Sequence, residues 1–147
     1  ADVDTHRSHV GMLYANVPVR PVGLIDRAME LLAASRCDSV QSYARVGKYH
    51  PQWQARLDDD GRIAPWEGDV LFGGVYRRQD LPPSYVPDGG VIAMTRRTLF
   101  EPINDGPHGF LGADHRGIAT AEGEVVDIDS PVDVLVAEAK LKGLGHL

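Results

Sequence analysis

A chain of 147 residues, with 43% apolar and 24% charged residues, is long enough to fold as one globular domain with a buried core. The net charge of −6 and the scattered basic residues, paired only at Arg77-Arg78 and Arg96-Arg97, argue against a nucleic-acid surface and against binding to anionic membranes. The single cysteine excludes a disulfide framework and fits a cytoplasmic protein, and no apolar run approaches the roughly 18 residues of a membrane span.

Strand-like and helix-like segments alternate from the start of the chain, which predicts an α/β fold. The apolar run 10–19 is interpreted as a buried strand. Pro21 then opens a helix predicted to reach Ala34, because proline suits a first helical turn. The apolar residues at helical spacing, expected to form its inner face, are Val22, Ile25, Met29 and Leu32.

The middle of the chain predicts a second strand, an irregular stretch and a hairpin. The strand is expected at 38–44. Residues 55–57 and 63–65 flank Asp58-Asp59-Asp60-Gly61, and an Asp-Gly pair favours a tight turn. We interpret these aspartates as a solvated turn in preference to a metal site.

The second half is predicted to alternate loops and short elements, ending in a helix. A strand at 90–95 and a short helix at 96–101 stand between loops at 79–87 and 102–114. Strands are expected at 117–121 and 125–128, and Pro131 starts a closing helix that stops near Gly143. The residues expected on the inner face of that helix are Val132, Leu135, Val136 and Ala139.

An Asp-X-Asp sequence follows the last predicted strand. Asp127 and Asp129 would point to the same side of a strand and could present both carboxylates to one Mg²⁺ ion. The alternative is that Asp129 or Ser130 only caps the closing helix, and both interpretations are compatible. A second Asp-X-Asp at 2–5 resembles the start of an aspartyl-phosphatase motif but lacks the buried strand which that chemistry needs.

Two further segments offer groups for an anionic ligand. Arg77 and Arg78 precede a proline-rich loop, and their forked donors suit a carboxylate or a phosphate. Lys48 and His50 lie in the irregular stretch before the hairpin. The alternative for each segment is an ordinary solvated surface.

Four blocks, in order, resemble the acylneuraminate cytidylyltransferase family, whose members join CTP and an acidic ulosonic sugar into a CMP-sugar and pyrophosphate. The similarity extends from about Val10 to Ala139. The blocks are Leu13-Tyr14-Ala15-Asn16-Val17-Pro18-Val19-Arg20-Pro21, His50-Pro51, Arg78-Gln79-Asp80-Leu81-Pro82 with Asp88-Gly89-Gly90, and Val126-Asp127-Ile128-Asp129-Ser130-Pro131. Each block is short, and their order and spacing carry the resemblance.

The resemblance implies a role for each matching residue. Asp127 and Asp129 would hold the catalytic Mg²⁺, and Arg78 would face the sugar carboxylate and act with them in catalysis. Substrate-binding roles are implied for Tyr14, Asn16, Arg20, Lys48, His50, Arg78, Gln79, Asp88, Gly89 and Phe110. The family has glutamine where this chain has Tyr14, and asparagine where it has Asp88, so the sugar need not be a sialic acid proper.

The resemblance also implies a fold and partners. We expect a three-layer, Rossmann-like α/β nucleotidyltransferase with a mostly parallel mixed sheet, of which residues 1–147 form the C-terminal portion. A hairpin arm at about 51–76 would serve a homodimer, or else be a lid or a surface hairpin. The expected substrates are CTP and an acidic nine-carbon sugar, although the sequence contains no Gly-, Arg- and Lys-rich loop for the triphosphate. The alternatives are a non-catalytic sugar-binding or dimerisation fragment and another Mg²⁺-dependent nucleotide-sugar enzyme.

Overall fold

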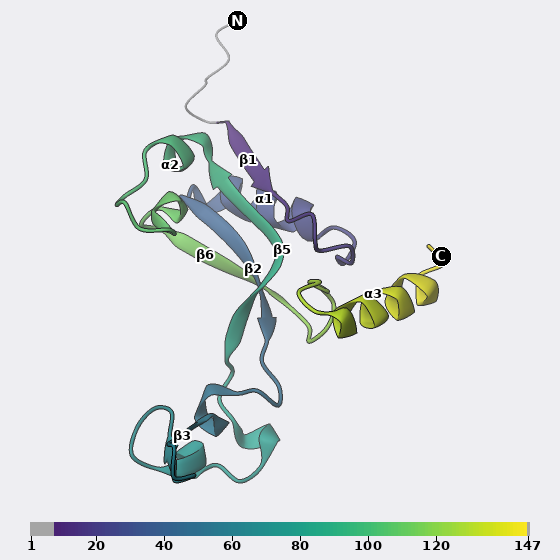
Figure 1. The fold of residues 1–147 in the computed structure, drawn as a ribbon. Helices are drawn as coiled ribbons and strands as arrows, with labels where there is room; N and C mark the ends of the chain where they lie inside the picture. Colours follow the sequence, from purple (N-terminus) through teal and green to yellow (C-terminus); the bar gives the residue numbers. More distant parts are fainter. Residues whose placement is uncertain (1–7, 147) are drawn as a thin grey trace, which may run out of the picture. The chain divides into compact units, whose positions relative to one another are not determined.

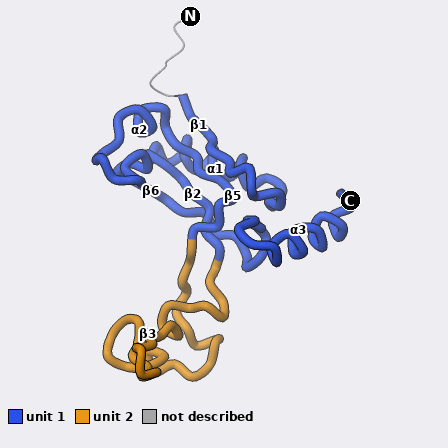
Figure 2. The backbone as a smooth tube through the Cα atoms, in the orientation of Figure 1, with its two compact units in different colours: residues 1–44, 87–147 blue, residues 45–86 orange. Residues whose placement is uncertain are grey.

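The computed structural model describes residues 8–146 and divides them into two compact units (Figure 2). Unit 1 contains the described residues up to Ala44 and those from Pro87 onward, and unit 2 comprises Arg45–Val86. The Asp-X-Asp at 2–5 lies outside the described residues. Within the described part of the chain, no helix is both long enough and apolar enough to cross a membrane.

Unit 1 is built on a four-stranded sheet with the strand order β1-β5-β2-β6 (Figure 1). The strands are β1 (His9–Met12), β2 (Ser39–Arg45), β5 (Tyr85–Thr95) and β6 (His115–Thr120). β1 pairs antiparallel with β5, from His9 opposite Thr95, and β2 pairs parallel with β6, from Ser39 opposite His115. The helices on this mixed sheet confirm the α/β class.

The expectation of a mostly parallel sheet is wrong for the described strands. The Thr95 amide donates to the Asp38 carbonyl, and the Val91 amide donates to the Ser42 hydroxyl, so β2 and β5 run in opposite directions (Figure 1). The physical reason is the connection, because the chain leaves β2 into unit 2 and returns directly as the neighbouring strand. Parallel neighbours would need a crossover segment. The three-layer arrangement stays a prediction.

The buried face of helix α1 (Leu24–Ser35) matches the predicted one only in part: Leu32 is buried and Met29 packs against the same core, as expected, but Val22 and Ile25 do not. Leu24, Ala28 and Leu32 are buried against Val40, Val91 and Ala93 of β2 and β5. Val22 is fully exposed, and Ile25 is 37% exposed. The helix begins three residues later than predicted, because Gly23 at its N-cap has a positive φ of 75° and breaks the helical path from Pro21. The buried residues of α1 are therefore spaced four apart, starting at Leu24.

The closing helix α3 (Pro131–Gly143) starts and stops where the sequence predicts. Its packing face is different from the predicted one, because Ala137 is buried against Val19 and Val126, with Leu141 partly buried beside them. The predicted inner residues Val132 and Leu135 are 62% and 64% exposed. The short helix α2 (Arg96–Phe100) follows β5 as expected.

Two predicted strands are shorter than expected. The run 10–19 is a strand only to Met12, and the loop after it returns at Val19, which forms an isolated antiparallel bridge with Val126. Residues 125–128 form no strand beyond that bridge. Two backbone hydrogen bonds, from Val126 to Val19 and from Ile128 to Asn16, replace a regular ladder.

Unit 2 contains the predicted hairpin, with β3 (Ala55–Leu57) paired antiparallel to β4 (Ile63–Pro65). The Asp58 carboxylate accepts the amides of Asp60 and Arg62 within the turn, so the aspartate run serves the turn as interpreted. The rest of this unit is short 3₁₀ turns at Pro51–Trp53, Leu71–Gly74 and Arg78–Asp80. The Trp53 indole donates to the Val75 carbonyl at 3.2 Å and holds the first and second of these turns together.

Candidate functional site

A cavity of about 560 Å³ lies within unit 1, on the face of the sheet opposite α1. Val40 and Val91 point into the core below α1, so alternation places Gln41 and Ile92 on the other face, where they line the cavity. The complete lining is Tyr14, Gln41, Tyr43, Pro87, Gly89, Ile92, Pro107, His108, Phe110, Leu111, His115 and Asp127. Four of the residues predicted from the sequence, Tyr14, Gly89, Phe110 and Asp127, therefore share one cavity.

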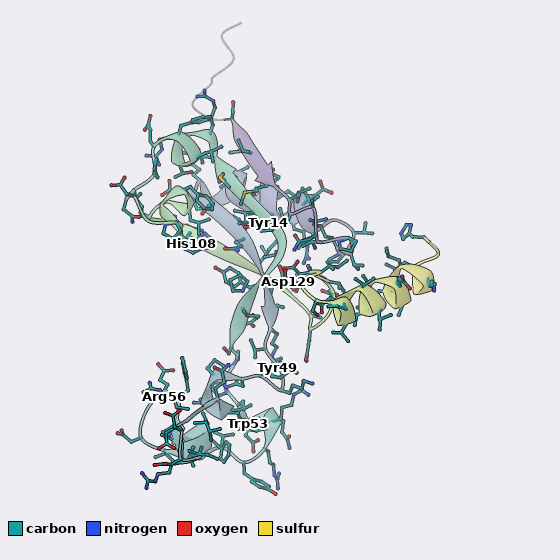
Figure 3. All side chains as sticks on the ribbon, in the orientation of Figure 1. Tyr14, Tyr49, Trp53, Arg56, His108 and Asp129 are labelled. Carbon is teal, nitrogen blue, oxygen red and sulfur yellow. The ribbon has the colours of Figure 1, made fainter. Side chains whose placement is uncertain are left out.

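The cavity residues come from separate parts of the chain. Tyr14 lies in the loop after β1, and His108 lies in the loop before β6 (Figure 3). Gly89 has a positive φ of 73°, and a Cβ atom there would lie 3.3 Å from Val17 and 3.5 Å from an oxygen of Asp127. Glycine at position 89 thus lets β5 approach both the first loop and the Asp-X-Asp segment.

Asn16 joins the two ends of the predicted site. Its side-chain amide donates to the Asp127 carboxylate at 2.6 Å, and one oxygen of the Asp129 carboxylate lies 3.4 Å from the same nitrogen. The sequence predicted that regular strand alternation would bring the two carboxylates together. They converge instead on one amide from a loop more than 100 residues away in sequence.

The pKa of Asp127 is raised above the ordinary aspartate value. The main cause is burial, and the nearby charge of Asp129 adds to it, while hydrogen bonds from Ile128 and Asn16 act in the opposite direction. Two carboxylates that repel each other, with Asp127 on the cavity wall, are a donor set suited to a cation. Among residues 8–146, no group of three or more His, Cys, Asp or Glu side chains is placed to hold a metal ion. A cation here would need ligands from substrate or water as well.

The Asp-X-Asp segment also caps the last helix. Ser130 is the N-cap, and the Asp133 carboxylate accepts hydrogen bonds from the Ser130 amide at 2.8 Å and from its hydroxyl at 2.7 Å. These hydrogen bonds lower the pKa of Asp133. The capping interpretation is therefore confirmed for Ser130, and it leaves the carboxylates of Asp127 and Asp129 available.

Asp88 is held by the protein itself. Its carboxylate accepts hydrogen bonds from the Ser42 hydroxyl, from the Gly90 amide at 2.9 Å and from the Thr120 hydroxyl at 2.6 Å. Ser42 and Thr120 are buried. These contacts give Asp88 a role in joining β2, β5 and β6, and its predicted contact with sugar stays a prediction.

Arg20 also makes contacts within the protein. Its guanidinium donates to the carbonyl oxygens of Gly90 at 2.7 Å, of Tyr14 at 2.7 Å and of Val17. The three carbonyls belong to the first loop and to β5. Arg20 therefore fixes the loop that carries Tyr14 and Asn16 beside the sheet.

The remaining predicted residues, Lys48, His50, Arg78 and Gln79, all lie in unit 2. His50 is buried, with Nε2 3.0 Å from the Pro82 carbonyl, and its Nδ1 accepts the Gln52 amide, so it caps the Pro51–Trp53 turn. The Lys48 ammonium lies over the Tyr49 ring at 4.7 Å. The substrate-binding roles of these four residues stay predictions.

Sequence reasoning missed the polar residues on the cavity face of the sheet, namely Gln41, Tyr43 and His115, and it missed His108 in the loop. The signal available was alternation in β2, which places Ser39, Gln41 and Tyr43 on one face. The parallel pairing with β6 brings His115 beside Ser39. That pairing was not visible in the sequence.

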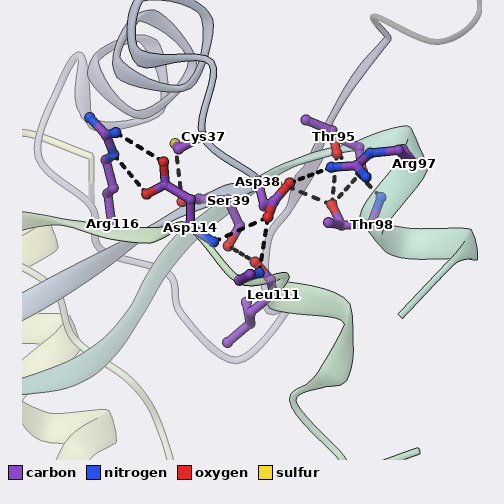
Figure 4. Close-up of polar contacts among 10 residues, drawn as sticks. Cys37, Asp38, Ser39, Thr95, Arg97, Thr98, Leu111, Asp114 and Arg116 are labelled. Atoms are coloured by element: carbon purple, nitrogen blue, oxygen red, sulfur yellow. Dashed lines mark hydrogen bonds and ion pairs between the residues drawn. The ribbon is translucent and has the colours of Figure 1, made fainter. Parts of the chain in front are cut away.

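A network at the start of β2 fixes the loop that closes the cavity (Figure 4). The Asp38 carboxylate accepts the amides of Ala113 and Asp114 at 2.9 and 3.1 Å, and it pairs with Arg97 at 2.6 Å. Gly112 packs directly on it, since a Cβ there would lie 2.3 Å from the Asp38 Cβ. Asp38 thereby holds Leu111 and His115 in place on the cavity wall.

Comparison with known proteins gives partial similarity to one kind of enzyme. The chain is 33% identical over 87 residues to proteins named N-acylneuraminate cytidylyltransferase from Streptococcus agalactiae serotype V and serotype III. The matched stretch is 59% of this chain, and it spans only 20% of the length of each relative. No protein-family profile matches the chain. Over part of its length, then, this chain is similar to part of a cytidylyltransferase.

Proposed function

We propose that the chain is the sugar-binding and metal-binding part of a nucleotidyltransferase that forms a CMP-sugar and pyrophosphate from CTP and an acidic nine-carbon sugar. The observation that carries the proposal is the convergence at one cavity of Tyr14, Gly89 and Asp127, which come from three separate blocks of the chain. The partial similarity to N-acylneuraminate cytidylyltransferases supports the same reaction class.

Magnesium would be held by Asp127 and Asp129. Their carboxylates fit the ion chemically, because Mg²⁺ is bound in proteins through one or two carboxylates together with substrate phosphates and water. Both carboxylates approach the Asn16 amide, and this convergence supports a shared electropositive partner. When bound, the ion would neutralise charge on the phosphates during transfer.

The protein's part in the reaction would be positioning. The anomeric hydroxyl oxygen of the sugar forms a bond to the α-phosphorus of CTP and loses its proton to water, the bond from that phosphorus to the bridging oxygen breaks, and pyrophosphate leaves. Tyr14 and Phe110 offer aromatic surface for the sugar, and Gly89 lets the backbone approach it. Arg20 and Asp88 act by holding the cavity walls.

The test is Mg²⁺-dependent pyrophosphate release by the protein that contains this chain, with CTP and a set of acidic nine-carbon sugars. Asp127→Asn should abolish turnover at every Mg²⁺ concentration, because it removes the carboxylate that both lines the cavity and faces Asp129. The matched control is Asp60→Asn in the hairpin turn, whose side chain is 75% exposed. Full turnover by Asp127→Asn would contradict the metal assignment.

A second candidate is a sugar-binding module without turnover. The observation that favours it is the absence of lysine and arginine among the residues described around the cavity, where a triphosphate would need cations. Sugar binding by calorimetry, combined with no pyrophosphate release from CTP, would select this candidate.

Homodimer formation through residues 51–76 is also a proposal. Its support is the exposed apolar surface of the hairpin, where Leu57 is 71%, Ile63 59% and Trp66 53% exposed. Sedimentation equilibrium of the protein and of an Ile63→Asp variant tests it, and a monomer in both cases would contradict it.

A further inference from the structure

Three polar side chains on the cavity wall take no part in the site proposed above. Gln41 and Tyr43 come from β2, and His115 comes from β6. Behind them lies Ser39, which is completely buried. Buried polar groups cost free energy unless their hydrogen bonds are made, so the partners of Ser39 and His115 determine what this wall presents to a ligand.

The hydrogen-bond chain has one consistent direction. The Ser39 hydroxyl donates to the Leu111 carbonyl, because a hydrogen must lie between those two oxygens. The Ser39 oxygen then accepts from Nδ1 of His115 at 2.7 Å. The other ring nitrogen, Nε2, is left as an acceptor and receives the Tyr43 hydroxyl at 3.0 Å. The chain therefore fixes the tautomer of a neutral imidazole.

This direction determines what Tyr43 can offer to a ligand. The hydroxyl hydrogen of Tyr43 points to His115, with a longer alternative at 3.4 Å to the Gln41 side-chain oxygen. Its lone pairs remain for a ligand, so the tyrosine acts as an acceptor. Burial also lowers the pKa of His115, which favours the neutral ring that the chain requires.

Gly117 creates the space that Tyr43 occupies. It pairs with Gln41 in the β2–β6 ladder, and a Cβ at this position would lie 3.1 Å from Cδ2 of the Tyr43 ring. A Cβ there would press the ring away from its place across β6, where it reaches His115 with ring centroids 6.2 Å apart. The position of the Tyr43 ring thus depends on Gly117 and His115 of β6 as well as on Tyr43 itself.

The charges around the cavity point to a neutral group as the ligand of this wall. Asp127 is the one carboxylate among the residues described as its lining, which contain no lysine or arginine. An anionic group at the Tyr43 wall would therefore meet no lysine or arginine side chain among these lining residues. A hydroxyl or an amide N–H, in contrast, would find the Tyr43 oxygen as an acceptor.

We propose that Tyr43 is a specificity-determining contact that accepts a hydrogen bond from one neutral donor of the sugar, a hydroxyl or an acylamino N–H, and that His115 is its positioning residue. The inference rests on the proposed function and deepens it, because it assigns this cavity to the uncharged part of an acidic sugar.

The experiment measures binding of the sugar alone by calorimetry, using the whole protein that contains this chain. The probes are an N-acylneuraminate and a series of analogues that each lack one hydroxyl or the acylamino group. Tyr43→Phe should weaken binding of the parent sugar roughly tenfold, the worth of one hydrogen bond. The wild type and Tyr43→Phe should bind one analogue with equal affinity, namely the one that lacks the group which donates to Tyr43. Equal losses for every analogue, or no loss for the parent sugar, would overturn the proposal.

Variants of the supporting residues separate positioning from simple structural damage. His115→Gln keeps an acceptor near the position of Nε2, so it should still bind the parent sugar more tightly than the analogue that lacks the donor to Tyr43. His115→Asn keeps only the contact to Ser39 and should lose that difference in affinity. Gly117→Ala should reproduce the loss of Tyr43→Phe with the hydroxyl still present. Tyr85→Phe, on a half-exposed side chain of β5, is the matched control and should bind like the wild type. Equal discrimination by His115→Asn and His115→Gln would remove His115 from its positioning role.

The outcomes distinguish this inference from the proposed function. If the wild-type protein binds none of the probes and releases no pyrophosphate, the proposed function fails and the inference fails with it. If the wild type binds and turns over the sugar while Tyr43→Phe matches it for every probe, only the inference fails.

Discussion

Replacing Asp88 with asparagine tests whether this carboxylate holds the sheet together. The carboxylate accepts three hydrogen bonds, from Ser42, Gly90 and Thr120. Asparagine keeps one oxygen for Ser42 and Gly90 but makes both bonds weaker, since bonds to a charged acceptor contribute about 1.5–3 kcal/mol and neutral ones about half of that. It also places an amide donor opposite the Thr120 hydroxyl, which must then turn to the Tyr43 carbonyl, 3.4 Å away.

The expected loss of stability for Asp88→Asn is roughly 2 kcal/mol, which corresponds to a fall of about 4–8 °C in Tm for a protein of this size. Urea unfolding followed by circular dichroism measures it, and Asp60→Asn on an exposed side chain is the control. Calorimetry with an acidic nine-carbon sugar should give an affinity within a fewfold of the wild type. Unchanged stability together with lost sugar binding would refute this reasoning and make Asp88 a ligand contact.

Three further predictions concern the core, a titrating residue and a glycine. Leu32→Ala should cost about 2–5 kcal/mol in urea unfolding, whereas Val22→Ala, on a fully exposed side chain, should change stability by less than about 0.5 kcal/mol. Burial lowers the pKa of His115 below 6.5, so the unfolded chain takes up a proton before the folded one does. Stability should therefore fall as the pH drops from 6.5 through the folded-state value, and His115→Gln should flatten that part of the stability–pH curve. Gly112→Ala should destabilise the protein by about 2–4 kcal/mol in thermal unfolding, because φ is 79° and the new Cβ would lie 2.3 Å from its neighbour. Gly123→Ala, with a similar φ of 78° and only an ordinary contact to the Lys140 side chain at 3.8 Å, should cost only about 1 kcal/mol.

Local signals in the sequence predicted most elements and several of their ends. The turn residues placed the hairpin within the observed bounds, and proline at position 131 with glycine at position 143 placed α3. Turns and helix ends depend mainly on residues that are adjacent in sequence, which is why the sequence alone could predict them. The predicted buried face was wrong for α3 and right for α1 only at Leu32 and Met29, because which apolar stripe is buried depends on where the sheet lies, as Ala137 and Leu24 illustrate.

The candidate site was predictable where short motifs carry chemistry, as at Asp127. What the sequence could not supply was pairing between distant segments. The parallel register of β2 with β6 puts His115 beside Ser39, and the loop after β1 puts Asn16 beside Asp127. For Arg20 and Asp88, the sequence pointed to a ligand, while the structure shows contacts to the protein's own backbone and hydroxyls.

The place of unit 2 in the chain has a consequence for how the protein can be altered. The chain leaves β2 and returns as the adjacent β5, and the Val46 amide donates to the Ser84 carbonyl at 2.9 Å to close the loop at its base. The entropy lost on closing a loop grows only with the logarithm of its length. Halving or doubling the length of the segment between these two residues therefore changes the cost of forming the sheet by only about 0.6 kcal/mol. Evolution and protein engineering alike can lengthen or shorten this segment while the residues that line the cavity, all outside 45–86, stay unchanged.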